Sequence, residues 1–288
     1  MSSPINDSEL PDVLLGIIRE RPEQCVYALI DGTANNVMLS HFFQTAPDAA
    51  YYPLFLGTDL EDCIPRSPYL VQIKSQHLDF IRHCCNEPAP IWFTSPLPLS
   101  QQPDFWKSRL YVELPDGRQP LFRYWSAGIL EPFIGTLDQS QAQQFLAPVE
   151  HLITPLSDQR RWLSRLIQTG ATVHAKPGSW RLAEPQLLAF QTHFSRIQAR
   201  EMENSLWDRS PELLSRLHPA LIPHRIQNGL NKGTELGLNR DTALSQFIEC
   251  QLLWGDNFWQ QEGFKELWGG TDSDKDFLAR LGQIRDEQ

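Results

Sequence analysis

Residues 110–137, LYVELPDGRQPLFRYWSAGILEPFIGTL, show the clearest local pattern in the chain. Apolar and polar side chains alternate over residues 110–114, which is the period of a strand with one buried face. Pro115, Asp116 and Gly117 follow in the order that a type I turn prefers. The pattern predicts a hairpin whose returning strand is residues 120–125.

A helix is expected directly after this hairpin. Ser126 is a residue type that caps helix N-termini. The apolar residues that recur at helical spacing after it are Ile129, Leu130, Phe133, Ile134 and Leu137. Pro132 must lie in the first turn of this helix or kink it.

The composition places the chain among globular proteins. Its 288 residues suffice for one large or two modest domains, and the usual domain size favours two. It has no apolar run long enough to span a membrane, and its N-terminal sequence MSSPINDSELPD lacks the parts of a signal peptide. The five cysteines are scattered and odd in number, which fits a reducing compartment. We therefore expect a cytoplasmic protein.

The net charge of −10 is concentrated in the first half of the chain. Residues 1–150 contain 9 Lys and Arg against 18 Asp and Glu, whereas residues 151–288 contain 16 against 17. An acidic surface repels phosphate backbones and anionic lipids, so we expect no nucleic acid partner and no membrane insertion. A basic face of another protein is a compatible partner.

The N-terminal half is predicted to be an α/β lobe. Strand-like apolar runs near residues 27, 53, 71 and 92 alternate with helical segments. The first run ends at Asp31 and Gly32 before a helix, as in the opening half of a βαβ unit. We expect residues 1–155 to form a mixed sheet with flanking helices, to which the hairpin adds an antiparallel pair.

The C-terminal half follows a different pattern. Residues 156–183 contain glycines and prolines between short apolar segments, which is typical of an irregular connector. From residue 184 to 288 the apolar residues recur at helical spacing, so this region is predicted to be an all-α lobe.

Two groups of side chains contain residue types that bind metals, but their spacing does not suit a metal site. His77, His83, Cys84 and Cys85 lie on one predicted helix, but the last three point about 100° apart and cannot converge on one ion. Residues 272–276, DSDKD, begin like a calcium loop, but Phe277 and Gln283 stand where that loop needs Gly and Glu. We therefore expect no metal and no cofactor.

No catalytic signature is found along the chain. The nucleophile elbow, the zinc-protease motif and the phosphate-binding loop are all missing, and Cys25 at a strand start is typical of a core residue. Asp31 and Gly32 lie at a strand end, where α/β proteins often bind ligands, although a turn that caps the next helix accounts for them equally well. The sequence favours a binding protein and no enzyme.

Three segments resemble the adaptor or chaperone family of bacterial type VI secretion, the Tap/Tec adaptors, catalogued as domain of unknown function 4123. They are ALIDG at 28–32, PLFLGT followed by PRSPYLVQI within 53–73, and PLFRYWSAGIL at 120–130. The positions that match the family motifs are Asp31, Gly32, Gly57, Thr58, Pro68, Tyr69, Arg123, Trp125 and Leu130. The helical segment 236–259 is also similar to the family's C-terminal region. One departure is that Ser126, Ala127 and Gly128 stand where the family has Asp-Pro-Arg.

The resemblance implies a cytoplasmic adaptor of two lobes that holds a toxic effector and loads it onto the VgrG spike. Its partners would be the effector and VgrG. The helical tail carries aromatic residues that are candidate partner contacts, although core packing is the simpler expectation for the first two: Trp254, Phe258, Trp259, Phe264 and Trp268.

Two other functions fit the same sequence. An immunity protein could use the acidic first half to block a basic toxin, and it would abolish the toxin's activity on binding. A hydrolase could place its site at the strand ends near Asp31, and it would need convergent Asp, His or Cys side chains in a pocket there.

Overall fold

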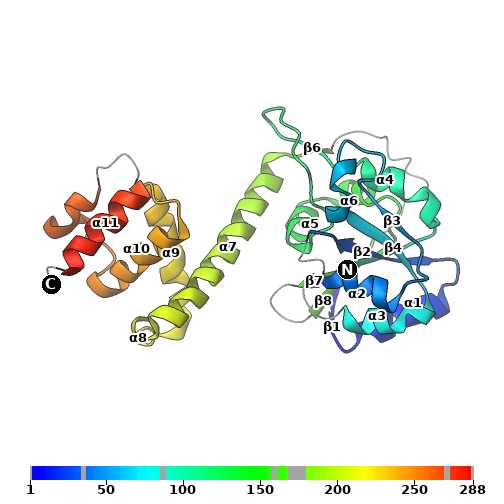
Figure 1. The fold of residues 1–288 in the computed structure, drawn as a ribbon, viewed down its shortest axis with the longest axis horizontal. Helices are drawn as coiled ribbons and strands as arrows, with labels where there is room; N and C mark the ends of the chain where they lie inside the picture. The colour runs from blue at the N-terminus through cyan, green and yellow to red at the C-terminus, as the bar shows by residue number, and fades with distance from the viewer. Residues whose placement is uncertain are drawn as a thin grey trace. The chain divides into compact units, whose positions relative to one another are not determined.

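The computed structural model describes residues 2–33, 37–84, 89–156, 161–167, 180–268 and 273–286. The chain divides into two compact units, Met1–Phe190 and Gln191–Gln288 (Figure 1). Among the described residues, no helix is both long and apolar enough to cross a membrane.

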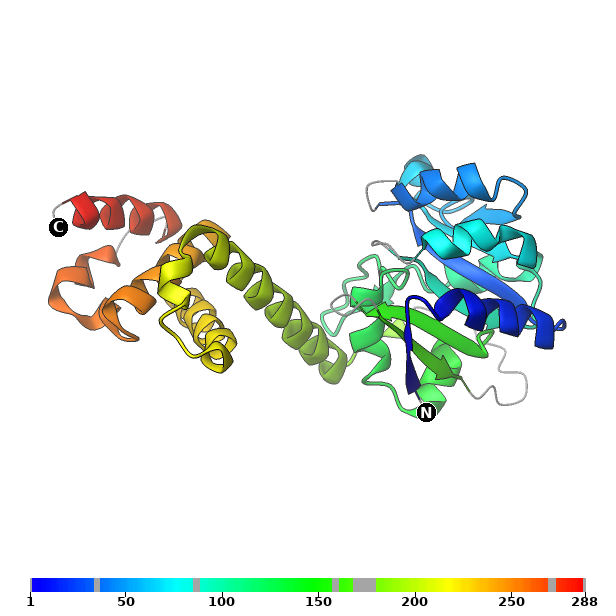
Figure 2. The ribbon, with the colours of Figure 1, turned by 90° about the horizontal axis from the view of Figure 1, so that it is seen from below.

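The first unit is built on a sheet of seven strands in the order β1-β8-β7-β5-β2-β4-β3. The strands are β1 (Ser2–Asn6), β2 (Cys25–Asp31), β3 (Tyr51–Pro53), β4 (Pro68–Ile73), β5 (Ile91–Ser95), β7 (His151–Leu156) and β8 (Arg161–Leu166). Figure 2 shows β1, in dark blue, beside the green strand β8, with which it pairs antiparallel. Every neighbouring pair in this sheet is antiparallel.

The expected α/β lobe is confirmed, but its strands alternate in direction. The helix α2 (Val37–Thr45) follows β2 and leads to β3, while β4 lies between these two strands. Because β4 is antiparallel to both, β2 and β3 run the same way, as strands joined by a helical crossover do. The alternation of strands and helices therefore predicted the crossover correctly. The strand near residue 71 was also expected, but its position between β2 and β3 was not.

Helices cover both faces of the sheet. One face packs against α1 (Leu10–Glu20), α2 and α3 (Leu78–His83). The other packs against α4 (Pro103–Lys107), α5 (Ala127–Ile134) and α6 (Gln139–Phe145). Short 3-10 helices at Glu61–Arg66, Ser75–His77 and Leu99–Gln101 complete the unit. The strand β2 lies inside the sheet and is buried on both faces, which explains its continuous apolar sequence.

The hairpin forms, but it does not join the large sheet. Gly117 has φ 84° and donates its N–H to the Leu114 carbonyl at 2.9 Å, which closes the expected turn. The strand β6 (Val112–Glu113) pairs instead in parallel with β9 (Trp180–Arg181) in a separate two-stranded sheet. The returning segment contributes one isolated bridge, Tyr111 to Leu121, because the chain then curls through tight turns.

The helix after the hairpin begins where the sequence predicted. Ser126 occupies the N-cap position with extended backbone angles, and its carbonyl accepts the N–H of Leu130 at 2.9 Å. Its hydroxyl makes no capping hydrogen bond. Pro132 lies inside α5, five residues after the helix begins at Ala127, and not in its first turn.

The region expected to be an irregular connector contains regular structure where it is described. Residues 161–166 form β8, in which Trp162 is buried, and Trp180 and Arg181 form β9. Trp162 and Ser164 are buried while Arg161, Leu163 and Arg165 are more exposed, so burial alternates with the period of a strand. The rest of the connector, residues 157–160 and 168–179, lies outside the described residues.

The second unit is helical, as the sequence predicted. It comprises the part of α7 (Glu184–Arg209) from Gln191 onward, α8 (Pro211–Leu214), α9 (Ile222–Glu235), α10 (Asp241–Trp254) and α11 (Ser273–Asp286), with 3-10 helices at Pro219–Leu221, Phe258–Gln260 and Glu262–Leu267. Its core surrounds Phe247, which is fully buried. Gly229 and Gly233 lie one turn apart on α9 and let α10 approach closely.

Candidate partner-binding site

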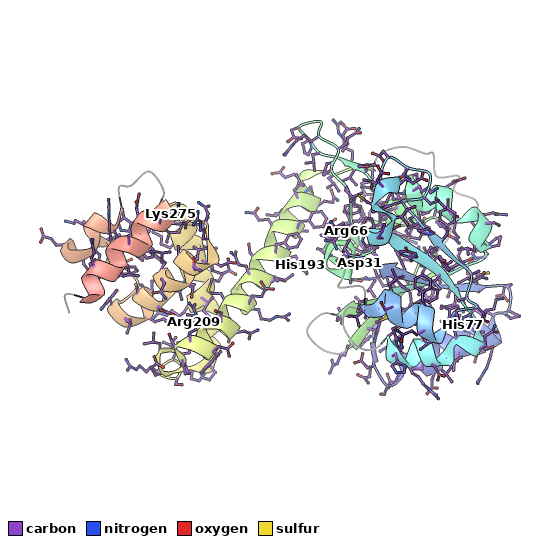
Figure 3. All side chains as sticks on the ribbon, in the orientation of Figure 1. Asp31, Arg66, His77, His193, Arg209 and Lys275 are labelled. Atoms are coloured by element: carbon purple, nitrogen blue, oxygen red, sulfur yellow. The ribbon has the colours of Figure 1, made fainter. Side chains whose placement is uncertain are left out.

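Three polar side chains meet at the end of β2. Arg123, from the segment before α5, donates from Nη2 to Asp31 Oδ2 at 2.7 Å and to Thr33 Oγ1 at 2.8 Å. The Thr33 hydroxyl donates to Asp31 Oδ1 at 2.6 Å, and the Thr33 N–H donates to the same oxygen at 2.9 Å. Asp31, labelled in Figure 3, thus holds both neighbours, and we call the three residues the Arg123 cluster.

The Arg123 guanidinium is only partly used by this cluster. Both of its hydrogen bonds come from Nη2, and within the described part of the chain Nε and Nη1 have no protein acceptor. The Arg123 side chain is 46% exposed, whereas the Asp31 side chain is 15% exposed. The cluster therefore presents an oriented cation whose remaining donors face solvent, a geometry suited to carboxylate or carbonyl oxygens.

Gly32 is required by the close approach of a second segment. A Cβ at this position would overlap the carbonyl oxygen of Ser67 and lie 3.1 Å from the Arg66 carbonyl carbon. Ser67 is itself fixed, since its hydroxyl accepts the N–H of Phe55 at 3.0 Å and donates to the Pro68 carbonyl at 2.9 Å. Asp31 pairs with Pro68 in the sheet, so these motif positions meet at the same edge.

Gly57 and Thr58 shape the loop that follows β3. Gly57 has φ 71°, and its N–H donates to Glu61 Oε2 at 3.0 Å. Thr58 donates from its hydroxyl to the Phe55 carbonyl at 2.7 Å and accepts the Leu60 N–H at 3.1 Å. These contacts are those of a structural turn.

The same loop is tied to the hairpin. Tyr111 donates its hydroxyl to Asp59 Oδ2 at 2.6 Å. Burial, together with the hydrogen bond to Asp59 and its negative charge, raises the pKa of Tyr111 to about 12. The phenol therefore stays protonated over the physiological range and keeps the hairpin attached to the loop.

The apolar motif positions are buried and contribute to packing. Trp125 is 2% exposed and meets the Phe55 ring edge-on at a centroid distance of 5.9 Å. Leu130 and Tyr69 are also buried. The motif therefore separates into packing residues and one exposed polar group. Sequence reasoning missed Thr33, Ser67 and the Tyr111–Asp59 contact, although Thr33 adjoins one motif segment and Ser67 lies within another.

The tail aromatics lie mainly in the core of the second unit. Phe258 and Phe264 are buried, so a partner cannot reach them in this conformation. Trp254, Trp259 and Trp268 are half-buried and pack against the same core. Partner contact through these three tryptophans stays a prediction.

The side chains with metal-ligand chemistry point to different neighbours. His77 is buried and lies 3.3 Å from Asp48, whereas His83 donates from Nδ1 to the Asp79 carbonyl oxygen at 2.7 Å. The Cys84 thiol donates to Met38 Sδ at 3.6 Å. Cys85 and Asp272 lie outside the described residues, within which no three such ligands gather. Asp274 instead accepts the N–H of Asn239 at 2.9 Å.

Fold and site together describe an α/β domain whose strand-end surface carries a fixed, half-exposed arginine, followed by a helical region. The model of the family described as "Domain of unknown function (DUF4123)" matches residues 26–144 of this chain. This family is associated with adaptor function in type VI secretion. No curated protein and no solved structure matches the chain.

Proposed function

We propose that this protein is a type VI secretion adaptor of the Tap/Tec kind, which binds an effector and assists its loading onto the VgrG spike. The observation that carries the proposal is that all nine family-motif positions fall within residues 26–144, which match the family model. Its action would be equilibrium binding, with no chemical step and no cofactor.

The Arg123 cluster is the surface that we assign to partner contact in this function. Asp31 and Thr33 hold the guanidinium in one orientation, so less side-chain entropy is lost when a partner binds. Arginine is also among the residues that most often dominate protein interfaces. The acidic balance of residues 1–150 favours a partner face that is basic overall, and the free donors of Arg123 favour oxygen acceptors at the point of contact.

Copurification tests the proposal directly. The protein is coexpressed with the effector and the VgrG encoded beside it, and tagged protein is recovered in gentle salt. We expect the wild type to recover effector and VgrG, and Arg123→Gln to recover about tenfold less of one of them, which corresponds to about 1.4 kcal/mol.

Arg118 offers a matched control for Arg123. It is also an exposed arginine that pairs with an aspartate at 2.7 Å, but its partner Asp116 is two residues away in the hairpin turn. Arg118→Gln should recover both proteins as the wild type does. Recovery of neither protein by the wild type would contradict the adaptor function, and equal recovery by Arg123→Gln would remove the cluster from it.

A further inference from the structure

A groove of about 370 Å³ lies between α7 and α10 within the second unit. Arg209, labelled in Figure 3, marks one end of it on the last turn of α7. Its walls are formed by Gln198, Glu201, Met202, Ser205 and Arg209 from α7 and by Asp241, Thr242 and Ser245 from α10. This volume is large enough for one or two side chains of a partner.

The floor of the groove is buried and partly apolar. Met202 is 5% exposed and belongs to the core of the unit, and Ser245 is 2% exposed. The thioether of Met202 is a flexible apolar surface that adapts to the shape of a bound side chain.

The cation at one end of the groove is already engaged. Arg209 Nη2 donates to the Ser245 hydroxyl and lies 3.8 Å from Glu249 Oε1, and Glu249 is buried. Ser210 also donates to this carboxylate, at 3.3 Å. Arg209 therefore offers little net positive charge to a ligand.

Two carboxylates at the opposite end are not neutralised. Glu201 is exposed, and among the described residues Asp241 accepts only from the side-chain amide of Gln198, at 3.3 Å. Neither forms an ion pair within the described ranges of the chain. The N-terminus of α10 would attract an anion, but Asp241 already occupies its first turn.

We propose that this groove binds a basic segment of the partner protein, with a Lys or Arg stem on Met202 and its charged head between Glu201 and Asp241. Long basic side chains commonly bury their stem while the head meets a carboxylate. This inference rests on the proposed adaptor function for the identity of the partner, whereas the chemistry of the groove can be tested separately.

Two short fluorescein-labelled peptides probe the groove of the full-length protein. They have the same length and leucine content, and their polar positions carry lysine in one and glutamate in the other. By fluorescence anisotropy, we expect the lysine peptide to bind at least about tenfold more tightly than the glutamate peptide. Glu201→Lys should weaken binding of the lysine peptide by about tenfold.

Glu203→Lys is the matched control. Glu203 lies on the same helix two residues away, hence on another face, and the substitution changes the net charge of the protein equally. The lysine peptide should bind this variant as it binds the wild type. Equal binding of the two peptides, equal loss in both variants, or no binding of the lysine peptide would each overturn the groove assignment.

The same variants in copurification separate this inference from the adaptor function. If the wild type recovers effector and VgrG and Glu201→Lys recovers both equally well, the function stands and the groove is not its partner site. If the wild type recovers neither, the adaptor function fails, while the peptide measurement still decides whether the groove binds basic side chains.

Discussion

The two units use glycine for close packing in different ways. In the first unit, a Cβ on Gly32 would overlap the backbone carbonyl oxygen of Ser67. In the second unit, a Cβ on Gly229 would lie 2.5 Å from Gln251 Oε1 and 2.6 Å from Ile248 Cγ1, both side-chain atoms. The Ser67 carbonyl directly precedes β4, whose Pro68 pairs with Asp31, so this backbone atom cannot move aside as a side chain can by changing rotamer.

This difference in packing predicts how rigid the candidate binding surface of each unit is. The Arg123 cluster joins residues 92 positions apart on a rigid strand end, while the groove lies between two helices that pack through side chains. We therefore expect the first unit to present a fixed site and the second to adapt more easily to what it binds.

Gly32→Ala should destabilise the protein more than Gly229→Ala or Thr33→Val. The new methyl group forces the end of β2 away from Ser67, at an expected cost of about 3 kcal/mol in the free energy of unfolding. Urea denaturation measures it. Gly16→Ala is the control, because that position in α1 has nothing within 4 Å, and it should stabilise by about 0.5–1 kcal/mol. Similar changes in the free energy of unfolding at Gly32 and Gly16 would contradict the close approach of Ser67 to Gly32.

Gly229→Ala should cost less, about 1–2 kcal/mol, because the Gln251 and Ile248 side chains can shift. Gly282 in α11 is the control in the same unit, because an added methyl group there would meet nothing within 4 Å, and Gly282→Ala should not destabilise. A cost equal to that of Gly32→Ala would mean that the helical unit is as rigid as the sheet.

Thr33→Val tests the orientation of Arg123 without changing any charge. The valine removes the hydroxyl that accepts from Arg123 and donates to Asp31, so the guanidinium is held by one group in place of two. We expect partner binding to weaken by about fivefold, or about 1 kcal/mol, measured by titration with purified effector. The unfolding free energy should change by less than about 1 kcal/mol, because the cluster is partly exposed.

The helical unit was the more predictable part of the fold. Its apolar residues repeat at helical spacing, and this signal is local, so the helices could be read from adjacent turns. The tail aromatics were harder to place. The same amphipathic pattern does not tell which aromatic faces the core, and Phe264, a candidate partner contact by sequence, is buried in the structure.

The sheet could be predicted only in part. Individual strands such as β2 were visible as apolar runs, but strand order depends on pairing between distant segments. The edge strand β1 was missed because SSPIN has a proline and little apolar character. Arg123 was recognised in the sequence as a family-motif position. Its ion pair with Asp31 joins distant segments of the fold, so it could be identified only in the structure.

The smallest expected effect is the pH dependence of stability that comes from histidines, and it offers another way to compare the two units. Burial lowers the pKa of His41, and the charge of His83, whose ring is 4.2 Å away, lowers it further. Burial and the charge of Arg21 lower the pKa of His151. In the second unit, burial and Arg196 lower the pKa of His193.

The unfolded chain therefore binds protons at these imidazoles more readily than the folded chain does. Their contribution to stability is complete above the ordinary histidine pKa of about 6.5 and is lost as the pH falls below it. We expect the melting temperature to drop between pH 7.5 and pH 5. His41→Phe keeps a ring against His83 and cannot titrate, so it should reduce this drop.

Hydrogen exchange at the two pH values, corrected for the intrinsic exchange rate, assigns the loss to each unit. Two of the three histidines lie in the first unit, so its slow amides should lose more protection in acid than those of α9 and α10. An equal loss in both units, unchanged by His41→Phe, would assign the acid sensitivity to other groups.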